Sequence, residues 1–333
     1  MIALLLALLS TFSIVANDPE TGEWGIAVAS KVPFVGQMVP WAKAGAGAIA
    51  TQAWANLGYG PEGLRLLSEG MSAEEVIQTL TSGDSLADQR QIGVVDSRGN
   101  PASFTGTETM FWAGGVTGQG YAIQGNILTG PEVVEAMERS FLATDGEILA
   151  YRLLEALKAG EDAGGDSRGR QSAAILVVRE NGGHQGSTDL LVDIQVSDNP
   201  EAVTELRRLY FRWWEPLNML ELYQGEKADA ILSRMASQDY GEAWMKNAVA
   251  WSMAMADLEL DRALEIALEA SASEPEDANI MDTVAEILFR LDRIDEAVQW
   301  GSRALESDPD NTYLQGQLDR FRGNAAGSPE PGH

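Results

Sequence analysis

Two kinds of hydrophobic periodicity divide the chain. Up to about Val196, short apolar runs alternate with glycine-rich turns, and a few stretches have the three-to-four-residue spacing of amphipathic helices. After Trp214 the strand-like runs stop, and helical spacing continues to Phe321. The pattern therefore predicts an α+β domain over residues 11–214 and an all-α segment over residues 226–322.

The first domain is predicted to mix hairpins with amphipathic helices. Thr11 to Ala16 and Trp24 to Ser30 are strand-like, and the turn-forming residues 17–23 between them predict a hairpin. Further strands are expected at 44–51, 91–96, 102–107, 121–127, 173–179 and 190–196. Helices are expected at 61–68, 73–81, 131–142, 148–159 and 201–213. Ser72 and Glu75 have the spacing of a capping box at the start of the second helix.

The helical segment contains an internal repeat. Three pairs of equivalent residues are each separated by 34 positions: Ala263 and Ala297, Ala270 and Ala304, Pro275 and Pro309. This spacing resembles the tetratricopeptide repeat, in which small residues let paired helices approach closely. Two repeats, 244–277 and 278–311, and a capping helix at 312–321 are expected; an ordinary helical bundle is the alternative. Such a surface would suit a peptide, a protein partner or self-association.

The two ends of the chain have distinct compositions. Residues 1–9 form an apolar run about half as long as the ~20 residues of a membrane-spanning helix, so we expect no stable membrane span. We interpret residues 1–10 as the remnant of a signal sequence, although no Lys or Arg precedes the run and Leu8 would occupy a position that favours a small residue. This interpretation predicts a periplasmic or secreted protein, and a buried N-terminal segment in a cytoplasmic protein is the alternative. Residues 323–333 are expected to form a disordered tail.

Composition excludes several mechanisms. The chain has no Cys and only two His, His184 and His333, which excludes thiolate chemistry, disulfides and histidine-rich zinc sites. A Ser-His-Asp triad would have to use His184, which lies in a glycine-rich turn and is interpreted as an ordinary exposed residue. With 23 basic and 50 acidic side chains, the net charge of −27 disfavours nucleic acid and anionic membranes as partners. No phosphate-binding loop or dinucleotide fingerprint is present, so no cofactor and no metal are expected.

Several motifs of the first domain resemble one bacterial family. They are TFSIVANDPETGEWGIAVAS (11–30), PWAKAGAGAIATQA (40–53), YGPEGLRLL (59–67), QIGVVD (91–96), QGNILTGPEVVEAM (124–137) and GGDSRGRQSAAILVV (164–178). On these segments the chain is similar to the family called domain of unknown function 1028, which is placed among the N-terminal nucleophile hydrolases. The resemblance implies a four-layer αββα sandwich whose first strand begins with a catalytic Thr, Ser or Cys exposed by processing.

Thr11 is the residue on which the implied chemistry falls. It begins the first strand directly after the apolar leader, so removal of residues 1–10 would expose it. A free α-amino group has a pKa of roughly 7.7–8.0 and can serve as the general base for a hydroxyl on the same residue. No histidine is then needed. Ser13 is the alternative nucleophile, and both hydroxyls also suit ordinary strand positions.

Other polar residues are candidates for assisting Thr11. Lys31 could polarise the site, or it could be an exposed lysine at a strand end. Ser30, Thr51 and Gln52 end neighbouring strands and are expected to line the same mouth, with packing roles as the alternative. Gly125 and Asn126 offer a backbone N–H and a side-chain amide suited to an oxyanion hole, although a strand-to-helix turn would use them equally well.

A glycine-rich loop carries two guanidinium groups in a chain that has few cations. Arg168 and Arg170 are two residues apart, so both are expected to face one substrate carboxylate, with Asp166 beside them. The alternative is that the loop pairs its own cations with Asp166 or with other carboxylates.

Two functions remain open from the sequence. The first is an amide-bond hydrolase with an N-terminal Thr nucleophile, acting on an unknown small-molecule or peptide substrate. The second is a non-catalytic binding or scaffold protein, in which the sandwich recognises a ligand and the repeats dock a partner. Trp213 and Trp214 close the first domain and are interpreted as an interdomain contact or the contact of a homodimer.

Overall fold

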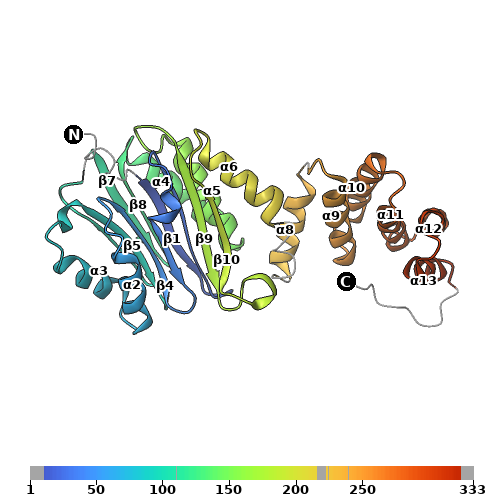
Figure 1. Ribbon diagram of the computed structural model, residues 1–333, viewed down its shortest axis with the longest axis horizontal. Helices are drawn as coiled ribbons and strands as arrows, with labels where there is room; N and C mark the ends of the chain where they lie inside the picture. The colour runs from blue at the N-terminus through green and yellow to red at the C-terminus, as the bar shows by residue number, and fades with distance from the viewer. Residues whose placement is uncertain (1–10, 110, 216–222, 224, 239, 324–333) are drawn as a thin grey trace. The chain divides into compact units, whose positions relative to one another are not determined.

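The computed structural model describes residues 11–109, 111–215, 223, 225–238 and 240–323 (Figure 1). The chain divides into two compact units, residues 1–210 and residues 211–333. The predicted leader, residues 1–10, and all of the predicted tail except Gly323 lie outside the described residues.

A six-stranded antiparallel sheet forms the centre of the first unit. Its strand order is β10-β9-β2-β1-β8-β7. The strands are β1 (Thr11–Asp18), β2 (Glu23–Ser30), β7 (Trp112–Gly118), β8 (Tyr121–Leu128), β9 (Ser172–Arg179) and β10 (Leu190–Val196). β1, β2 and β8 are buried along their whole length. The predicted first hairpin is confirmed, with Thr11 paired to Ser30.

A four-stranded antiparallel sheet packs against the first one. Its order is β3-β4-β5-β6, with β3 at Pro40–Lys43, β4 at Gly47–Ala53, β5 at Arg90–Asp96 and β6 at Pro101–Thr105. Val15 and Val28 from the larger sheet share an apolar cluster with Ala50 and Val95 from the smaller one. Because side chains alternate across a strand, Ser13 and Thr11 lie on the same face of β1 as Val15.

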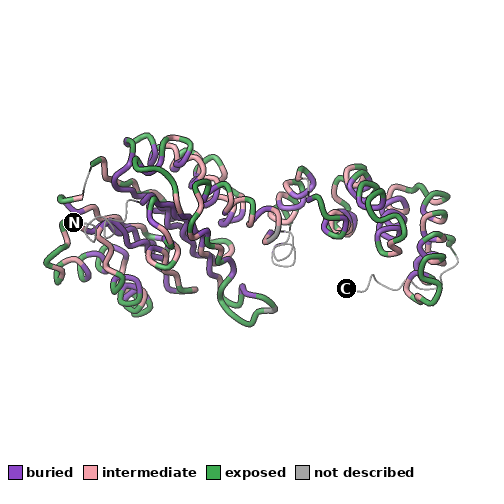
Figure 2. The backbone as a smooth tube through the Cα atoms, turned by 45° about the horizontal axis from the view of Figure 1, so that its top comes forward, coloured by how far each residue is buried: buried purple, intermediate pink, exposed green. Residues whose placement is uncertain are grey.

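Helices cover the outer faces of both sheets. α2 (Tyr59–Ser68) and α3 (Ala73–Ser82) pack on the four-stranded sheet, and α4 (Glu132–Ala143), α5 (Leu149–Asp162) and α6 (Ala202–Leu209) pack on the six-stranded sheet. Figure 2 shows the buried strands between helices whose outer sides are exposed. The α+β class is confirmed, and the first unit has four layers. The capping box at Ser72 and Glu75 is present.

Three segments of the structure differ from the sequence prediction. The expected strand 44–51 begins with the turn that joins β3 to β4 and continues into β4, and in this turn Gly45 has a φ of 71°, a conformation that favours glycine. The alternating Ala and Gly of this segment concealed the turn. β7 was not predicted, because its sequence WAGGVTG is glycine-rich and its residues are half-buried or exposed at the sheet edge. The expected helix 201–213 is α6 followed by a π-helix at Tyr210–Trp214.

The second unit is helical throughout its described residues. It contains α8 (Glu226–Ala236), α9 (Ala243–Met255), α10 (Leu260–Ser273), α11 (Ala278–Arg290), α12 (Ile294–Ser307) and α13 (Thr312–Phe321). Leu260 and Ile294, which begin α10 and α12, are separated by 34 residues, as are Ala278 and Thr312, which begin α11 and α13. The helical segment is confirmed, and its assignment to the tetratricopeptide repeats stays a prediction. Across the described residues, none of the helices is long and apolar enough to cross a bilayer.

Candidate functional site

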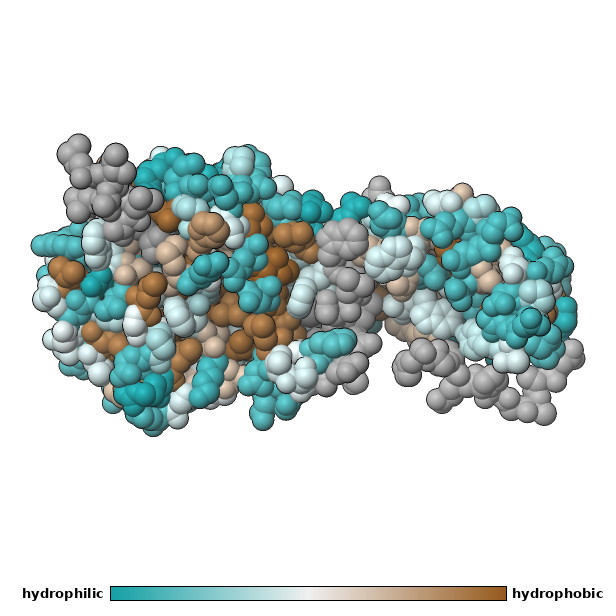
Figure 3. Space-filling model, viewed as in Figure 1, coloured by the Kyte–Doolittle hydropathy of each residue, from teal (hydrophilic) through white to brown (hydrophobic). Residues whose placement is uncertain are grey.

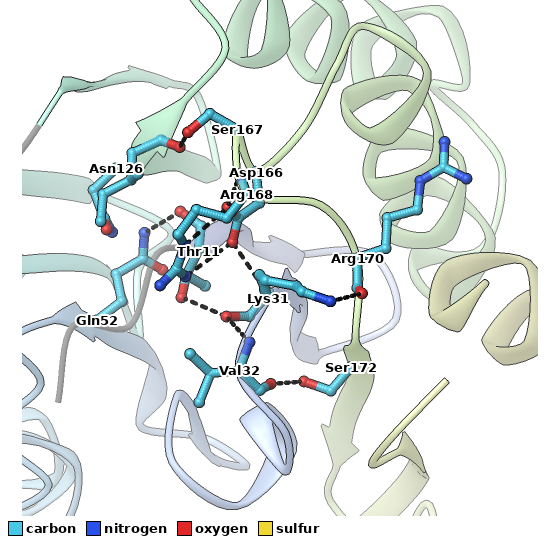
Figure 4. Close-up of polar contacts among 12 residues, drawn as sticks. Thr11, Lys31, Val32, Gln52, Asn126, Asp166, Ser167, Arg168, Arg170 and Ser172 are labelled. Atoms are coloured by element: carbon cyan, nitrogen blue, oxygen red, sulfur yellow. Dashed lines mark hydrogen bonds and ion pairs between the residues drawn. The ribbon is translucent and has the colours of Figure 1, made fainter. Parts of the chain in front are cut away.

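Thr11 is the first residue of β1 and lies at one end of the six-stranded sheet, between β2 and β8. It pairs with Ser30 of β2 on one side and with Asn126 of β8 on the other. Directly opposed residues on one face of a sheet hold their Cβ atoms about 4.5–5.5 Å apart, so the three polar side chains gather at this end. The Thr11 hydroxyl lies 3.5 Å from the Ser30 hydroxyl and has an exposed fraction of 0% in the chain that carries residues 1–10 (Figure 4).

Buried amides link Thr11 to the opposite sheet. Gln52 of β4 donates from Nε2 to the backbone oxygen of Thr11 at 3.2 Å. Its Oε1 accepts from the Ser13 hydroxyl at 2.7 Å, and that hydroxyl in turn accepts from Gln124 Nε2 at 2.7 Å. Ser13, two residues after Thr11 on β1, therefore belongs to the network that spans the two sheets.

Gln91 of β5 is the centre of this network, and the sequence analysis did not single it out. Its Oε1 accepts from Gln52 Nε2 at 2.8 Å and from Asn126 Nδ2 at 3.0 Å. Its Nε2 donates to the backbone oxygens of Gly125 and Gly114 at 2.8 and 3.2 Å, and also to the Thr105 hydroxyl at 2.9 Å. Because the two backbone oxygens only accept, the orientation of the Gln91 amide is determined. Because Gln91 Oε1 can only accept, the Gln52 and Asn126 side chains direct their NH₂ groups toward this oxygen.

The glycine-rich loop between α5 and β9 closes the same end of the sheet. Asp166, whose side chain is 1% exposed, accepts from the backbone N–H of Lys31 at 2.8 Å and from that of Arg168 at 2.9 Å. The Arg168 guanidinium folds back onto the Asp166 carboxylate at 3.1 Å. Ser167 donates from its hydroxyl to the backbone oxygen of Ile127 at 2.8 Å. Asp166 therefore ties the loop to the end of β2 beside Thr11.

Arg170 lies on the other side of this loop. Its guanidinium contacts Glu201 at 3.0 Å and the buried Glu161 at 3.5 Å. Arg170 and Glu161 border a cavity of about 60 Å³ that Phe12 also lines. Burial raises the pKa of the Glu161 carboxyl, and the positive charges of Arg170 and Lys158 act in the opposite direction. In Figure 4 the Arg170 guanidinium points away from Thr11.

The structure separates some of the residues that the sequence groups together. Arg168 contacts Asp166 and Arg170 contacts Glu201, so the two guanidinium groups have different protein partners. Thr51 and Gln52 are consecutive strand residues and therefore face opposite sides of β4, and the Thr51 hydroxyl donates to the Asn56 backbone oxygen at 3.4 Å. Substrate contacts of Arg168, Arg170, Thr51 and Gln52 stay a prediction.

The surroundings of Lys31 and Gly125 differ from those that the sequence analysis expects. Lys31 is exposed, and its ammonium group donates to the Arg170 backbone oxygen at 3.1 Å rather than to Thr11. Gly125 lies inside β8, paired with Phe12 and with Gly114, so its backbone belongs to the ladder of a central strand and not to a turn. Ser30, Gln52 and Asn126 are the expected residues that the structure brings together around Thr11.

Backbone strain is concentrated at this end of the sandwich. Among the described residues of the first unit, five that are not glycine have a positive φ: Phe34, Ala53, Phe111, Ile127 and Asn181. All but Asn181 lie at or just beyond strand ends at the Thr11 edge of the two sheets. Ala53 follows Gln52, and Ile127 follows Asn126. Such conformations cost on the order of 1–3 kcal/mol each for bulky residues and gather at functional sites.

No group of three or more His, Asp or Glu side chains is arranged to hold a metal ion in the part of the chain that the structure describes.

Among solved structures, a crystal structure of a Silicibacter pomeroyi protein assigned to the DUF1028 family is similar to this chain. The two are 32% identical, the TM-score is 0.55, and the match covers 70% of this chain and 96% of that one. No curated protein matches. A family model described as a family of unknown function, DUF1028, matches residues 11–206, which is more than half of the chain. The chain therefore belongs to the DUF1028 family.

Proposed function

We propose that the first unit is an amide-bond hydrolase of the N-terminal nucleophile type, with Thr11 as the nucleophile once residues 1–10 are removed. The observation that carries this proposal is the place of Thr11 at the end of a central strand. There Ser30, Gln52 and Asn126 converge, and four of the five left-handed non-glycine residues in the described part of the first unit lie at the same edge. The four layers of helices and sheets agree with the sandwich that this chemistry uses.

The chemistry proceeds by acyl transfer. The Thr11 hydroxyl attacks the amide carbonyl, and its proton passes to the α-amino group of the same residue. That amine then protonates the leaving nitrogen, the C–N bond breaks, and a Thr11 ester remains. Water, deprotonated by the same amine, hydrolyses the ester and restores the free hydroxyl. All proton transfers use one amine, so neither a histidine nor a metal enters the reaction.

Neighbouring groups assist at defined atoms. Ser30 Oγ, 3.5 Å from Thr11 Oγ1, is placed to orient the nucleophile. Asn126 Nδ2 donates to Gln91 Oε1, which fixes the side-chain amide beside Thr11, and this amide is the proposed donor to the developing oxyanion. Preorganised donors of this kind are worth about 2.7–4 kcal/mol of transition-state stabilisation.

The alternative is a binding or scaffold protein. One observation favours it: Thr11 is fully buried while residues 1–10 are attached, so an unprocessed chain could not use its hydroxyl. In this case the helical unit, with its tetratricopeptide-like spacing, would be the functional part and would dock a peptide or a second copy of the chain.

Mass spectrometry of the mature N-terminus in the native host separates the two functions. We expect a chain that begins at Thr11, and intact residues 1–10 would exclude the hydrolase. The second step uses a chain whose N-terminus at Thr11 is generated by cleavage of a fusion partner, with hydrolysis of fluorogenic amides measured. Thr11→Ala should abolish turnover and Thr11→Ser should retain part of it. Thr117→Ala, at an exposed strand position, is the matched control and should leave the rate unchanged.

A further inference from the structure

β7 is an edge strand with an open side. It ends the strand order of the six-stranded sheet, on the opposite side from β10, and among the described residues it pairs with β8 alone (Figure 1). All seven of its residues are half-buried or exposed. A groove of about 360 Å³ lies between β7 and β6, lined in part by Ser103, Thr105, Gly115 and Thr117. The edge is therefore accessible to a further strand.

The contacts of Gln91 show which backbone groups of β7 face the open side. Gln91 Nε2 lies 3.2 Å from the Gly114 oxygen and 2.8 Å from the oxygen of Gly125, its partner in β8, so both oxygens lie between the two strands. Successive residues of a strand direct their N–H and C=O groups to opposite sides, so the alternate residues of β7 direct theirs away from β8. They are Ala113, Gly115 and Thr117, and the last two are also the exposed residues of the strand.

β7 lacks the residues that protect the other edges of the two sheets. β3 contains Pro40 and Lys43, β6 begins at Pro101, and β10 carries the exposed Asp193. Proline and charged residues on an edge strand prevent pairing with the strands of other chains. β7 contains neither kind of residue, and the bulge at its start leaves the stretch from Ala113 onward regular. An unprotected edge is expected where pairing with another strand is used.

The charge pattern favours a second copy of the chain as the occupant of this edge. Residues 109–131 contain no Asp, Glu, Lys or Arg, although the whole chain has a net charge of −27. Hydrophilic residues cover much of both units in the view of Figure 3. Two such acidic copies repel each other, so they can approach closely only where carboxylates are scarce. Among the described residues that line the groove, Glu74 is the one with a charge, so a charged partner would gain little there.

The sequence of β7 also suits pairing with itself. About a two-fold axis at Gly115, this glycine lies opposite Gly115 of the second copy, and Ala113 lies opposite Thr117 of the second copy. Directly opposed residues of this kind exchange both of their backbone hydrogen bonds. Gly115 leaves the axis uncrowded, because it has no side chain. Phe111, immediately before β7, is 76% exposed, and aromatic side chains are enriched in interfaces, so its ring adds apolar area beside the paired strands.

We infer that β7 pairs antiparallel with β7 of a second copy, so that the chain forms a homodimer whose six-stranded sheets are continuous. The backbones of Ala113, Gly115 and Thr117 make the contact. This pairing does not require Thr11 to be catalytic. It is a different contact from the one predicted at Trp213 and Trp214 from the sequence.

Sedimentation equilibrium of the full chain tests the pairing with three changes at one exposed position. Thr117→Pro removes an edge N–H from each copy and should raise the dissociation constant of the dimer about tenfold or more, since two backbone hydrogen bonds are lost. Thr117→Glu keeps the N–H but adds a like charge, so the dimer should weaken at low salt and recover in part at high salt. Thr117→Ala is the matched control and should dimerise as the wild type does. Circular dichroism checks that each variant is folded.

Cross-linking tests the register of the two strands, because the chain has no cysteine of its own. The double variant Ala113→Cys with Thr117→Cys places thiols opposite each other, at a Cα separation of about 5.5 Å that a disulfide can bridge. Oxidation with diamide should therefore convert this variant to a covalent dimer. Thr117→Cys alone should stay unlinked, because its two thiols would lie four residues apart along the paired strands, or about 14 Å.

Four outcomes would overturn this homodimer. A wild-type chain that stays monomeric at high concentration would leave the edge to a peptide from another protein. A dimer that Thr117→Pro and Thr117→Glu leave unchanged would be held by a different surface, such as the one predicted at Trp213 and Trp214. Assemblies larger than a dimer would mean that β7 pairs with a different edge of the next copy. Equal cross-linking of the single and the double cysteine variants would exclude the register centred on Gly115.

Discussion

Gln91→Met is the substitution that most directly tests how the end of the sandwich is held together. The glutamine is fully buried and joins five partners across the two sheets. Its Nε2 has two hydrogens for three acceptors, so the change removes about four hydrogen bonds in effect. At ~0.5–1.5 kcal/mol each, and with part of this returned by the buried thioether, the free energy of unfolding should fall by about 2–4 kcal/mol.

Urea denaturation measures this loss. The midpoint should move to lower urea with an unchanged slope, since the surface exposed on unfolding is nearly the same. Gln119→Met is the matched control, because Gln119 lies in the exposed turn between β7 and β8 and should change stability by less than about 0.5 kcal/mol. In the chain that begins at Thr11, Gln91→Met should also slow turnover, because Gln91 orients Gln52 and Asn126.

An equally small effect for Gln91→Met and Gln119→Met would refute this reasoning. It would mean that the five partners reorganise around the methionine without cost. Loss of stability with full turnover would separate the two parts of the argument. The network would then hold the sheets together without positioning the groups around Thr11.

Two other substitutions test separate parts of the chain. Ser72→Ala removes the side chain that caps α3, so the free energy of unfolding should fall by about 1 kcal/mol and the melting temperature should fall with it. Ser82→Ala, at the other end of the helix, is the control and should have a smaller effect. In the second unit, burial and the Glu286 carboxylate raise the pKa of Asp282 to about 7, with Tyr313 and Arg320 acting against them. The folded chain thus holds a proton that the unfolded chain loses, so this contribution to stability is present below about pH 4 and is lost as the pH rises to about 7. Asp282→Asn should abolish this pH-dependent decrease in the free energy of unfolding, which is up to about 4 kcal/mol in the wild type. The measurement is the urea midpoint at pH 4 and at pH 8, and an equal change in midpoint for the variant and the wild type would contradict the reasoning.

Much of the fold could be predicted because its signals are local. β1 and β2 are continuous apolar runs on either side of turn residues, and Ser72 and Glu75 identify the start of α3. β7 lacked such a signal, because a glycine-rich edge strand is assigned by its hydrogen bonds to β8 and not by its own side chains. The turn between β3 and β4 was missed for a related reason: Ala and Gly suit strands and turns alike.

The candidate site was predictable only in part. Thr11, Ser30 and Asn126 could be placed together, since they end strands or begin them in a recognisable order. Gln91 and Gln124 could not, because one polar residue in a strand gives no indication of its partners across two sheets. The only available signal was that Gln91 has the same parity as Gly93 and Val95, which points it toward the other sheet.

The polarity of the space between the sheets changes along β1, and this change bears on function. Val15 packs in an apolar cluster with Val28 and Val95, whereas Ser13 and Thr11, on the same face, contact amides and hydroxyls. A buried polar network is rarely more stable than apolar side chains of the same volume, because every group must be desolvated and paired. A sandwich selected for packing alone would continue the valine and alanine layer to the end of the strand. The chain instead keeps its polar side chains where its backbone is also strained, which is the combination that a preorganised site at Thr11 requires.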